Sequence, residues 1–94
     1  MATVMQMHWA EATKDQYEAA RKMVGWETNT PQGAKYHVAW FAKDGLHVID
    51  VWDSAPDFNR FLETRLMPAV QKIGIKGQPN VQLADAHATY APNP

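Results

Sequence analysis

The chain has 94 residues, no cysteine and a formal net charge of −1, and 46% of its residues are hydrophobic. This length fits one small domain, residues 1–94, and the near-neutral charge argues against a nucleic-acid partner. No apolar run approaches the roughly 20 residues of a membrane span, and no secretion signal pattern opens the chain, so no membrane partner is expected. Without cysteine, disulfides and Cys-zinc sites are excluded, and a reducing cytoplasm is the expected location.

The first predicted element is a strand over Thr3–Trp9. Its residues alternate, which places Met5 and Met7 on an apolar face and Gln6 and His8 on the other face. A helix follows, with Thr13 as its N-cap. The apolar stripe of this helix consists of Tyr17, Ala20 and Val24.

A β-hairpin is predicted between Tyr36 and Trp52. Asp44-Gly45 separates two β-rich runs and is a sequence favoured at the centre of a two-residue type I′ turn. That turn would pair Phe41 with Val48 and His37 with Trp52. His47 is expected on the helix side of the sheet, near the turn.

A second helix and a last strand complete the chain. Ser54 is the predicted N-cap, and an apolar stripe runs at helical spacing to Ile73. Pro68 interrupts this stripe and predicts a kink or a restart, because proline removes a backbone donor. The last strand is predicted over Val81–Tyr90.

The element order β-α-β-β-α-β predicts a ferredoxin-like α+β domain with a four-stranded antiparallel sheet. Both helices would cover one face, and Ile49 and Val51 are expected beneath them with Val38 and Trp40. The uncovered face would then carry His37, Ala39, Phe41, Val48, Asp50 and Trp52. Because exposed apolar patches mark interaction sites, we expect a homodimer formed through this open face, with a cavity lined by its polar members. Gln6 and His8 are expected to point into the same cavity. On the last strand His87 and Asp85 are expected to do so, and Gln82 and Tyr90 fit nearly as well.

The sequence resembles the dimeric α+β barrel superfamily, and within it the small antibiotic-biosynthesis-monooxygenase-like proteins. The resemblance lies in Asp50-Val51-Trp52-Asp53-Ser54 at a strand end, in the helix opening Pro56-Asp57-Phe58, and in Tyr36-His37-Val38-Ala39 on the preceding strand. It implies a homodimeric barrel. It also implies that Trp52 lines the cavity, as the matching Trp does in members that oxygenate polycyclic aromatics or degrade haem.

Haem degradation is not expected of this chain. The resemblance implies an Asn on the first strand and a His on the second helix for that activity. The first strand instead has Met5, Gln6 and Met7, and no histidine lies between Asp57 and Ile73.

The predicted function is monooxygenase-like oxidation or binding of a small hydrophobic or aromatic molecule without a dedicated cofactor. His37 and Asp50 are the candidate catalytic pair, because a carboxylate orients an imidazole that acts as a general base. The candidate substrate-binding residues are Trp52, Phe41, Gln6, His8 and His87. The alternatives are a non-catalytic ligand-binding or structural dimer, in which His37 and Asp50 satisfy each other, and a cyclase or isomerase that uses the same pair.

A metal site built from His8, His37, His87 and Asp50 is a weaker hypothesis. Two histidines with a carboxylate suit iron or another divalent ion. No two of these residues stand at a short diagnostic spacing, however, so neither a metal nor a cofactor is predicted.

Overall fold

The structure, a computed structural model, describes residues 1–92. Its elements are β1 (Thr3–Trp9), α1 (Lys14–Val24), β2 (Ala34–Ala42), β3 (Gly45–Trp52), α2 (Ala55–Phe61), the π-helical turn η1 (Leu62–Leu66), α3 (Met67–Ile73) and β4 (Asn80–Asp85). Because α2, η1 and α3 follow one another without a break, the predicted β-α-β-β-α-β order is confirmed. The last strand ends at Asp85, five residues earlier than predicted.

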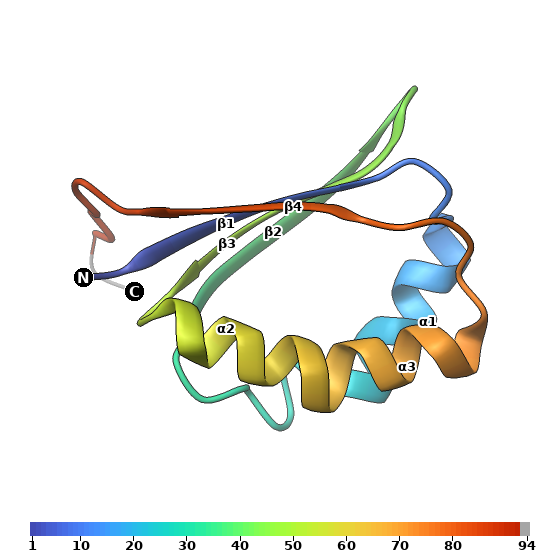
Figure 1. The fold of residues 1–94 in the computed structure, drawn as a ribbon, viewed down its shortest axis with the longest axis horizontal. Helices are drawn as coiled ribbons and strands as arrows, with labels where there is room; N and C mark the ends of the chain where they lie inside the picture. Colours follow the sequence, from blue (N-terminus) through green and yellow to red (C-terminus); the bar gives the residue numbers. More distant parts are fainter. Residues whose placement is uncertain (93–94) are drawn as a thin grey trace.

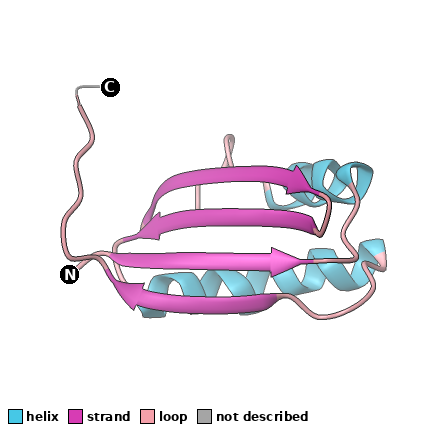
Figure 2. Ribbon diagram, turned by 90° about the horizontal axis from the view of Figure 1, so that it is seen from above, coloured by secondary structure: helices cyan, strands magenta, loops and turns pink. Residues whose placement is uncertain are grey.

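The four strands form one antiparallel sheet in the order β2-β3-β1-β4. All helices lie on the same side of this sheet, and no element of residues 1–92 covers the opposite side (Figures 1 and 2). The predicted ferredoxin-like architecture is therefore confirmed. No helix within residues 1–92 has the length and apolar character to cross a bilayer.

Local signals in the sequence place the helix ends. The Thr13 side chain accepts a hydrogen bond from the Gln16 backbone, and the Gln16 side chain accepts one from the Thr13 backbone, which closes a capping box. Ser54 caps α2 in the predicted way. Ahead of Pro68, the helix widens into η1, where the Met67 amide bonds to the Leu62 carbonyl, so the predicted interruption is present.

The hairpin turn differs from the prediction. Lys43 and Asp44 form the turn, and Ala42 pairs with Gly45, so each predicted pair is shifted by two residues. Gly45 has φ +110°, and a Cβ there would lie 2.6 Å from the Trp9 carbonyl oxygen. This glycine is needed for the close approach of the hairpin to the end of β1, and not for the centre of a type I′ turn.

The faces of β2 and β3 are the reverse of the prediction, whereas β1 has Gln6 and His8 on the uncovered face as predicted. The helix-covered face carries Met5, Met7, Trp9, His37, Ala39, Phe41, Leu46, Val48, Asp50 and Trp52. The uncovered face carries Val4, Gln6, His8, Tyr36, Val38, Trp40, His47, Ile49 and Val51. Directly paired residues share a face, and β1 pairs Met5 with Asp50 and Met7 with Val48. The apolar face of β1 therefore decides which side of β3 turns inward.

Large aromatic side chains explain why this side of β3 faces the helices. Trp52 is fully buried, with its ring centroid 5.6 Å from that of Phe58 and 5.3 Å from that of Phe61. Burying an indole removes more apolar surface from water than burying Ile49 or Val51 would. Asp50 accompanies Trp52 into the core because the two residues are two positions apart on one strand.

Replacing Gly45 by alanine tests the close contact at the hairpin. Gly74 is the matched control, since it also has a positive φ but no atom within 4 Å of an added Cβ. Left-handed strain should lower the unfolding free energy of Gly74→Ala by about 1–2 kcal/mol. Gly45→Ala should lower the unfolding free energy by at least about 1 kcal/mol more than Gly74→Ala does, because the added Cβ meets backbone atoms, which cannot rotate away. Urea denaturation measures both; equal losses would contradict the predicted packing.

Candidate functional site

A cavity lies between the sheet and the helices of a single protomer. The volume of this cavity is about 80 Å³, which is more than one water molecule needs. Most of its wall is apolar and includes Met5, Met7, Val48, Phe58, Phe61 and Val70. His37 and Asp50, which were predicted to line a cavity at the uncovered face, line this cavity on the opposite side of the sheet.

Three polar side chains form a continuous hydrogen-bonded chain in the cavity wall. The Tyr17 hydroxyl lies 2.7 Å from His37 Nε2, and His37 Nδ1 lies 2.6 Å from Asp50 Oδ1. The Trp52 indole N–H donates to the other carboxylate oxygen, Oδ2, at 3.1 Å. All buried side-chain nitrogen and oxygen atoms within residues 1–92 have a partner.

The direction of these bonds follows from the carboxylate. An ionised Asp50 can only accept hydrogen bonds, so His37 Nδ1 carries a proton. In the neutral imidazole, Nε2 then has a free lone pair, and the Tyr17 hydroxyl donates to it. The chain therefore runs from phenol to imidazole to carboxylate.

The register of the sheet brings this chain together. His37 on β2 pairs directly with Asp50 on β3 instead of with Trp52, two residues further along, and Tyr17 reaches them from the first turns of α1. The Trp26 ring lies 4.7 Å from the imidazole, centroid to centroid. The predicted pairing of His37 with Asp50 on one face is thus present, although that face is the covered one.

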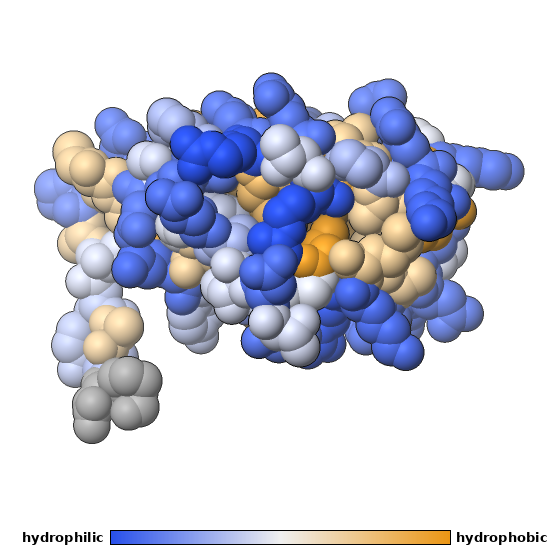
Figure 3. Space-filling view, turned by 90° about the horizontal axis from the view of Figure 1, so that it is seen from below, coloured by the Kyte–Doolittle hydropathy of each residue, from blue (hydrophilic) through white to orange (hydrophobic). Residues whose placement is uncertain are grey.

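The phenol end of the chain lies where the cavity meets the surface. Tyr17 and His37 also line a groove between α1 and β2. Across this opening Arg21 Nε lies 2.7 Å from Glu27 Oε1. Burial raises the pKa of Tyr17, and the nearby Arg21 charge partly opposes this shift. Viewed from the helix side, hydrophobic surface is visible among polar side chains near the middle of this face (Figure 3).

Trp52 and Phe41 do not line the cavity. Trp52 lies behind the cavity wall: it packs edge-on against Trp26, with centroids 5.7 Å apart, and its indole N–H donates to Asp50. Phe41 lies in the outer groove, edge-on to Tyr17. Trp52 therefore orients the carboxylate, and Trp26 provides the indole that borders the cavity.

The other predicted binding residues lie elsewhere. Gln6 and His8 are on the uncovered face of the sheet, and His87 follows β4 and is exposed. None of them lines the cavity. The hypothetical metal set of His8, His37, His87 and Asp50 is consequently not brought together.

Sequence reasoning missed Tyr17, Trp26, Arg21 and Glu27 as site residues. Tyr17 was assigned to the helix core, and its position on the apolar stripe was the available signal, since a buried phenol hydroxyl needs a partner. Trp26, Arg21 and Glu27 converge only through the turn that follows α1. The sequence has no periodic pattern there.

Removing the Asp50 carboxylate should destabilise the fold. Asp50→Ala leaves the His37 and Trp52 donors without an acceptor, so we expect a loss of about 2–4 kcal/mol in unfolding free energy. Asp50→Asn keeps one acceptor and should lose less. The control Asp53→Ala removes only an exposed ion pair with Lys35 and should change stability by less than about 1 kcal/mol. If chemical denaturation gives the same small change for Asp50→Ala as for the control, the buried network contributes nothing.

No family model and no curated protein matches this sequence. Solved structures nevertheless share its fold over nearly the whole chain. NE2512, a protein of unknown function from Nitrosomonas europaea, has a TM-score of 0.69 at 14% identity, covering 99% of this chain and 95% of its own. SnoaB, a cofactor-independent oxygenase from Streptomyces nogalater, has a TM-score of 0.65 at 18% identity, covering 94% of each chain.

A third similar structure, also from Nitrosomonas europaea, is provisionally assigned as an antibiotic biosynthesis monooxygenase. It has a TM-score of 0.62 at 12% identity, covering 94% of this chain and all of its own. Identities this low establish a common architecture and no common activity. The chain therefore has the fold of the antibiotic-biosynthesis-monooxygenase-like proteins, as the sequence resemblance predicts.

Proposed function

We propose that this protein binds a small hydrophobic or aromatic molecule in its cavity and oxidises it with O₂ without a dedicated cofactor. The observation that carries the proposal is the chain Tyr17–His37–Asp50, which places a proton acceptor against an apolar cavity. The oxygenase named among the similar structures supports the same class of reaction.

The chain of hydrogen bonds suits removal of a proton from a bound substrate. A substrate hydroxyl or enol donates to the Tyr17 oxygen while the Tyr17 proton moves to His37 Nε2. The Asp50 carboxylate then stabilises the imidazolium that forms. In this proposal His37 and Asp50 take the catalytic roles that the sequence suggests for them, and Tyr17 is the group that touches the substrate.

The redox step balances without an added reductant. The deprotonated, electron-rich substrate transfers electrons to O₂, and an activated CH₂ group becomes C=O. One oxygen atom enters the product, and the other leaves as water together with the two hydrogens of the CH₂ group. All four electrons come from the substrate. The apolar walls favour this chemistry, because electrostatic interactions are stronger where water is excluded.

Two-ring hydroxylated ketones with an activated methylene, such as hydroxyindanones and hydroxytetralones, are suitable probes. The native protein should consume O₂ with them in the absence of any reductant. Tyr17→Phe and His37→Gln should lower kcat/KM by about 100-fold or more, since positioned proton transfer contributes at least that much. His87→Gln, which changes an exposed histidine far from the cavity, should match the native rate.

The same experiment separates the alternative functions. Binding of a probe, followed by tryptophan fluorescence, with no O₂ consumption would support the ligand-binding alternative. Exchange of the methylene hydrogens with deuterated water, without O₂ uptake, would support the isomerase alternative. A full oxidation rate in His37→Gln would contradict the proposed proton transfer.

We also infer that two copies pair through the uncovered sheet face. The observed side chains on this face differ from those predicted, yet Tyr36, Val38 and Trp40 are 63%, 42% and 43% exposed. They flank Ile49 and Val51 on β3. Apolar groups gathered on one face in this way are typical of an interface.

Val38→Asp should convert the dimer into monomers, because it buries an unpaired charge in the interface. Leu83→Asp is a matched control: Leu83 is 40% exposed but pairs with Met5 and so lies toward the helix side. Sedimentation velocity at micromolar concentration should give a dimer for the native protein and for Leu83→Asp. A monomeric native protein would contradict the inference.

A further inference from the structure

A second group of titratable residues lies on the uncovered face, away from the cavity. His8 on β1 and His47 on β3 are direct cross-strand partners, and their rings stack with centroids 4.6 Å apart and an interplanar angle of 20°. Asp44, in the hairpin turn, lies over the end of this pair. His47 was expected on the helix side, so its position beside His8 corrects the sequence interpretation.

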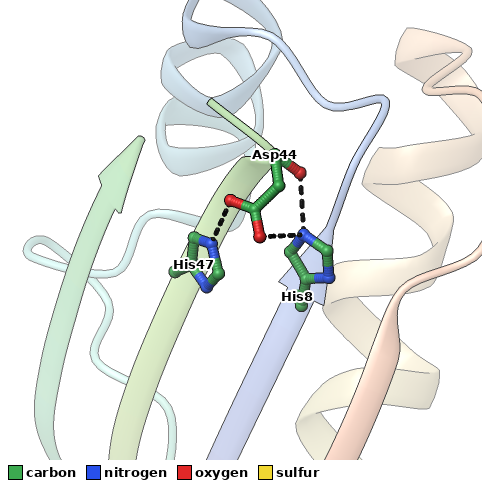
Figure 4. Close-up of side chains that lie close together, drawn as sticks. All are labelled: His8, Asp44 and His47. Carbon is green, nitrogen blue, oxygen red and sulfur yellow. Dashed lines mark hydrogen bonds and ion pairs between the residues drawn. The ribbon is translucent and has the colours of Figure 1, made fainter. Parts of the chain in front are cut away.

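Both imidazoles turn the same nitrogen toward Asp44 (Figure 4). His47 Nε2 lies 2.7 Å from Asp44 Oδ1, and His8 Nε2 lies 3.5 Å from Oδ2 and 2.7 Å from the Asp44 carbonyl oxygen. One ligand atom from each residue lies within 4.8 Å of the other two. We propose that His8, His47 and Asp44 form a binding site for a divalent transition-metal ion of the zinc type.

The spacing fits a tetrahedral ion. Zinc binds histidine nitrogen and carboxylate oxygen at about 2.0–2.2 Å, which separates neighbouring ligand atoms by about 3.4 Å. The separations of 2.7 Å to Oδ1 and 3.5 Å to Oδ2 lie near that value, and one ligand atom from each of the three residues lies within 4.8 Å of the other two. Side-chain rotations that bring both nitrogens to about 3.4 Å from one carboxylate oxygen and from each other would place all three atoms on one ion. Three protein ligands leave a fourth position for water.

The chemistry of the donors selects the class of metal. Two imidazole nitrogens and one carboxylate suit Zn²⁺ and its transition-metal neighbours, whereas Ca²⁺ and Mg²⁺ prefer oxygen ligands alone. No thiolate is present, because the chain has no cysteine.

The surroundings keep the site both ordered and open. The Trp40 ring stacks on His47 at 5.2 Å with an interplanar angle of 10°, which restrains the imidazole. The side chains of His8, Asp44 and His47 are 39%, 59% and 26% exposed in the single chain, and Asp44, in the hairpin turn, is the most open of the three. A bound ion would join the hairpin turn to β1.

Isothermal titration with Zn²⁺, and Co²⁺ absorption spectroscopy, test the site. The native protein should bind one Zn²⁺ per chain with saturation at micromolar concentration, and Co²⁺ should give the intense visible bands of a tetrahedral site. His8→Asn and His47→Asn should each weaken Zn²⁺ binding by at least about tenfold, since losing even an outer partner of a metal ligand has that effect. Asp44→Asn should also weaken Zn²⁺ binding, because it removes the carboxylate charge while the hairpin turn keeps its shape.

The matched control is His87→Asn, which removes an exposed histidine outside the site and should leave affinity unchanged. Val38→Asp should also keep the affinity, because all three ligands come from one chain. The proposal is overturned if the native protein shows no saturable Zn²⁺ binding. It is equally overturned if His87→Asn weakens binding as much as His8→Asn, or if His8→Asn and His47→Asn, both shown to be folded by circular dichroism, bind Zn²⁺ as tightly as the native protein.

Discussion

The structure depends on how it accommodates one buried carboxylate. Asp50 is 3% exposed and lies among methionine and aromatic side chains, where an unpaired charge would be strongly unfavourable. His37 and Trp52 each direct an N–H at one of its two oxygens. Burial of the Asp50 carboxylate therefore depends on the direct cross-strand pairing with His37. The same pairing leaves the other imidazole nitrogen, Nε2, facing Tyr17 and the cavity.

This arrangement gives the two faces of the sheet different roles. The helix-covered face contains the aromatic core and the cavity, with the hydrogen-bonded path that ends at Asp50. The uncovered face contains the exposed aromatic and aliphatic side chains of β2 and, near the hairpin turn, the two stacked histidines. The proposed oxidation and the proposed dimer therefore depend on opposite faces of the sheet.

The sequence was sufficient for the element order, both helix caps, the interruption near Pro68 and the association of His37 with Asp50. These features depend on local signals or on the alternation of side chains along a strand, and both can be read directly from the order of residues. It misassigned the covered face, because Ile49 and Val51 are purely aliphatic whereas Asp50 alternates with Trp52. The pairing of Met5 with Asp50 decides which face of β3 is covered, and this pairing between distant strands cannot be read from the sequence. Tyr17 and Trp26 reach the site only through tertiary packing.

The most direct test of this account is the ionisation and tautomeric state of His37, measured by nitrogen-15 NMR of the four histidine side chains. The account predicts a neutral His37 with its proton on Nδ1, a strongly deshielded and slowly exchanging Nδ1 proton, and an unprotonated Nε2. Tyr17→Phe should change the Nε2 shift, because it removes the hydrogen bond to that atom. A proton on Nε2 with rapid exchange, as in a solvated histidine, would contradict the buried chain from phenol to carboxylate.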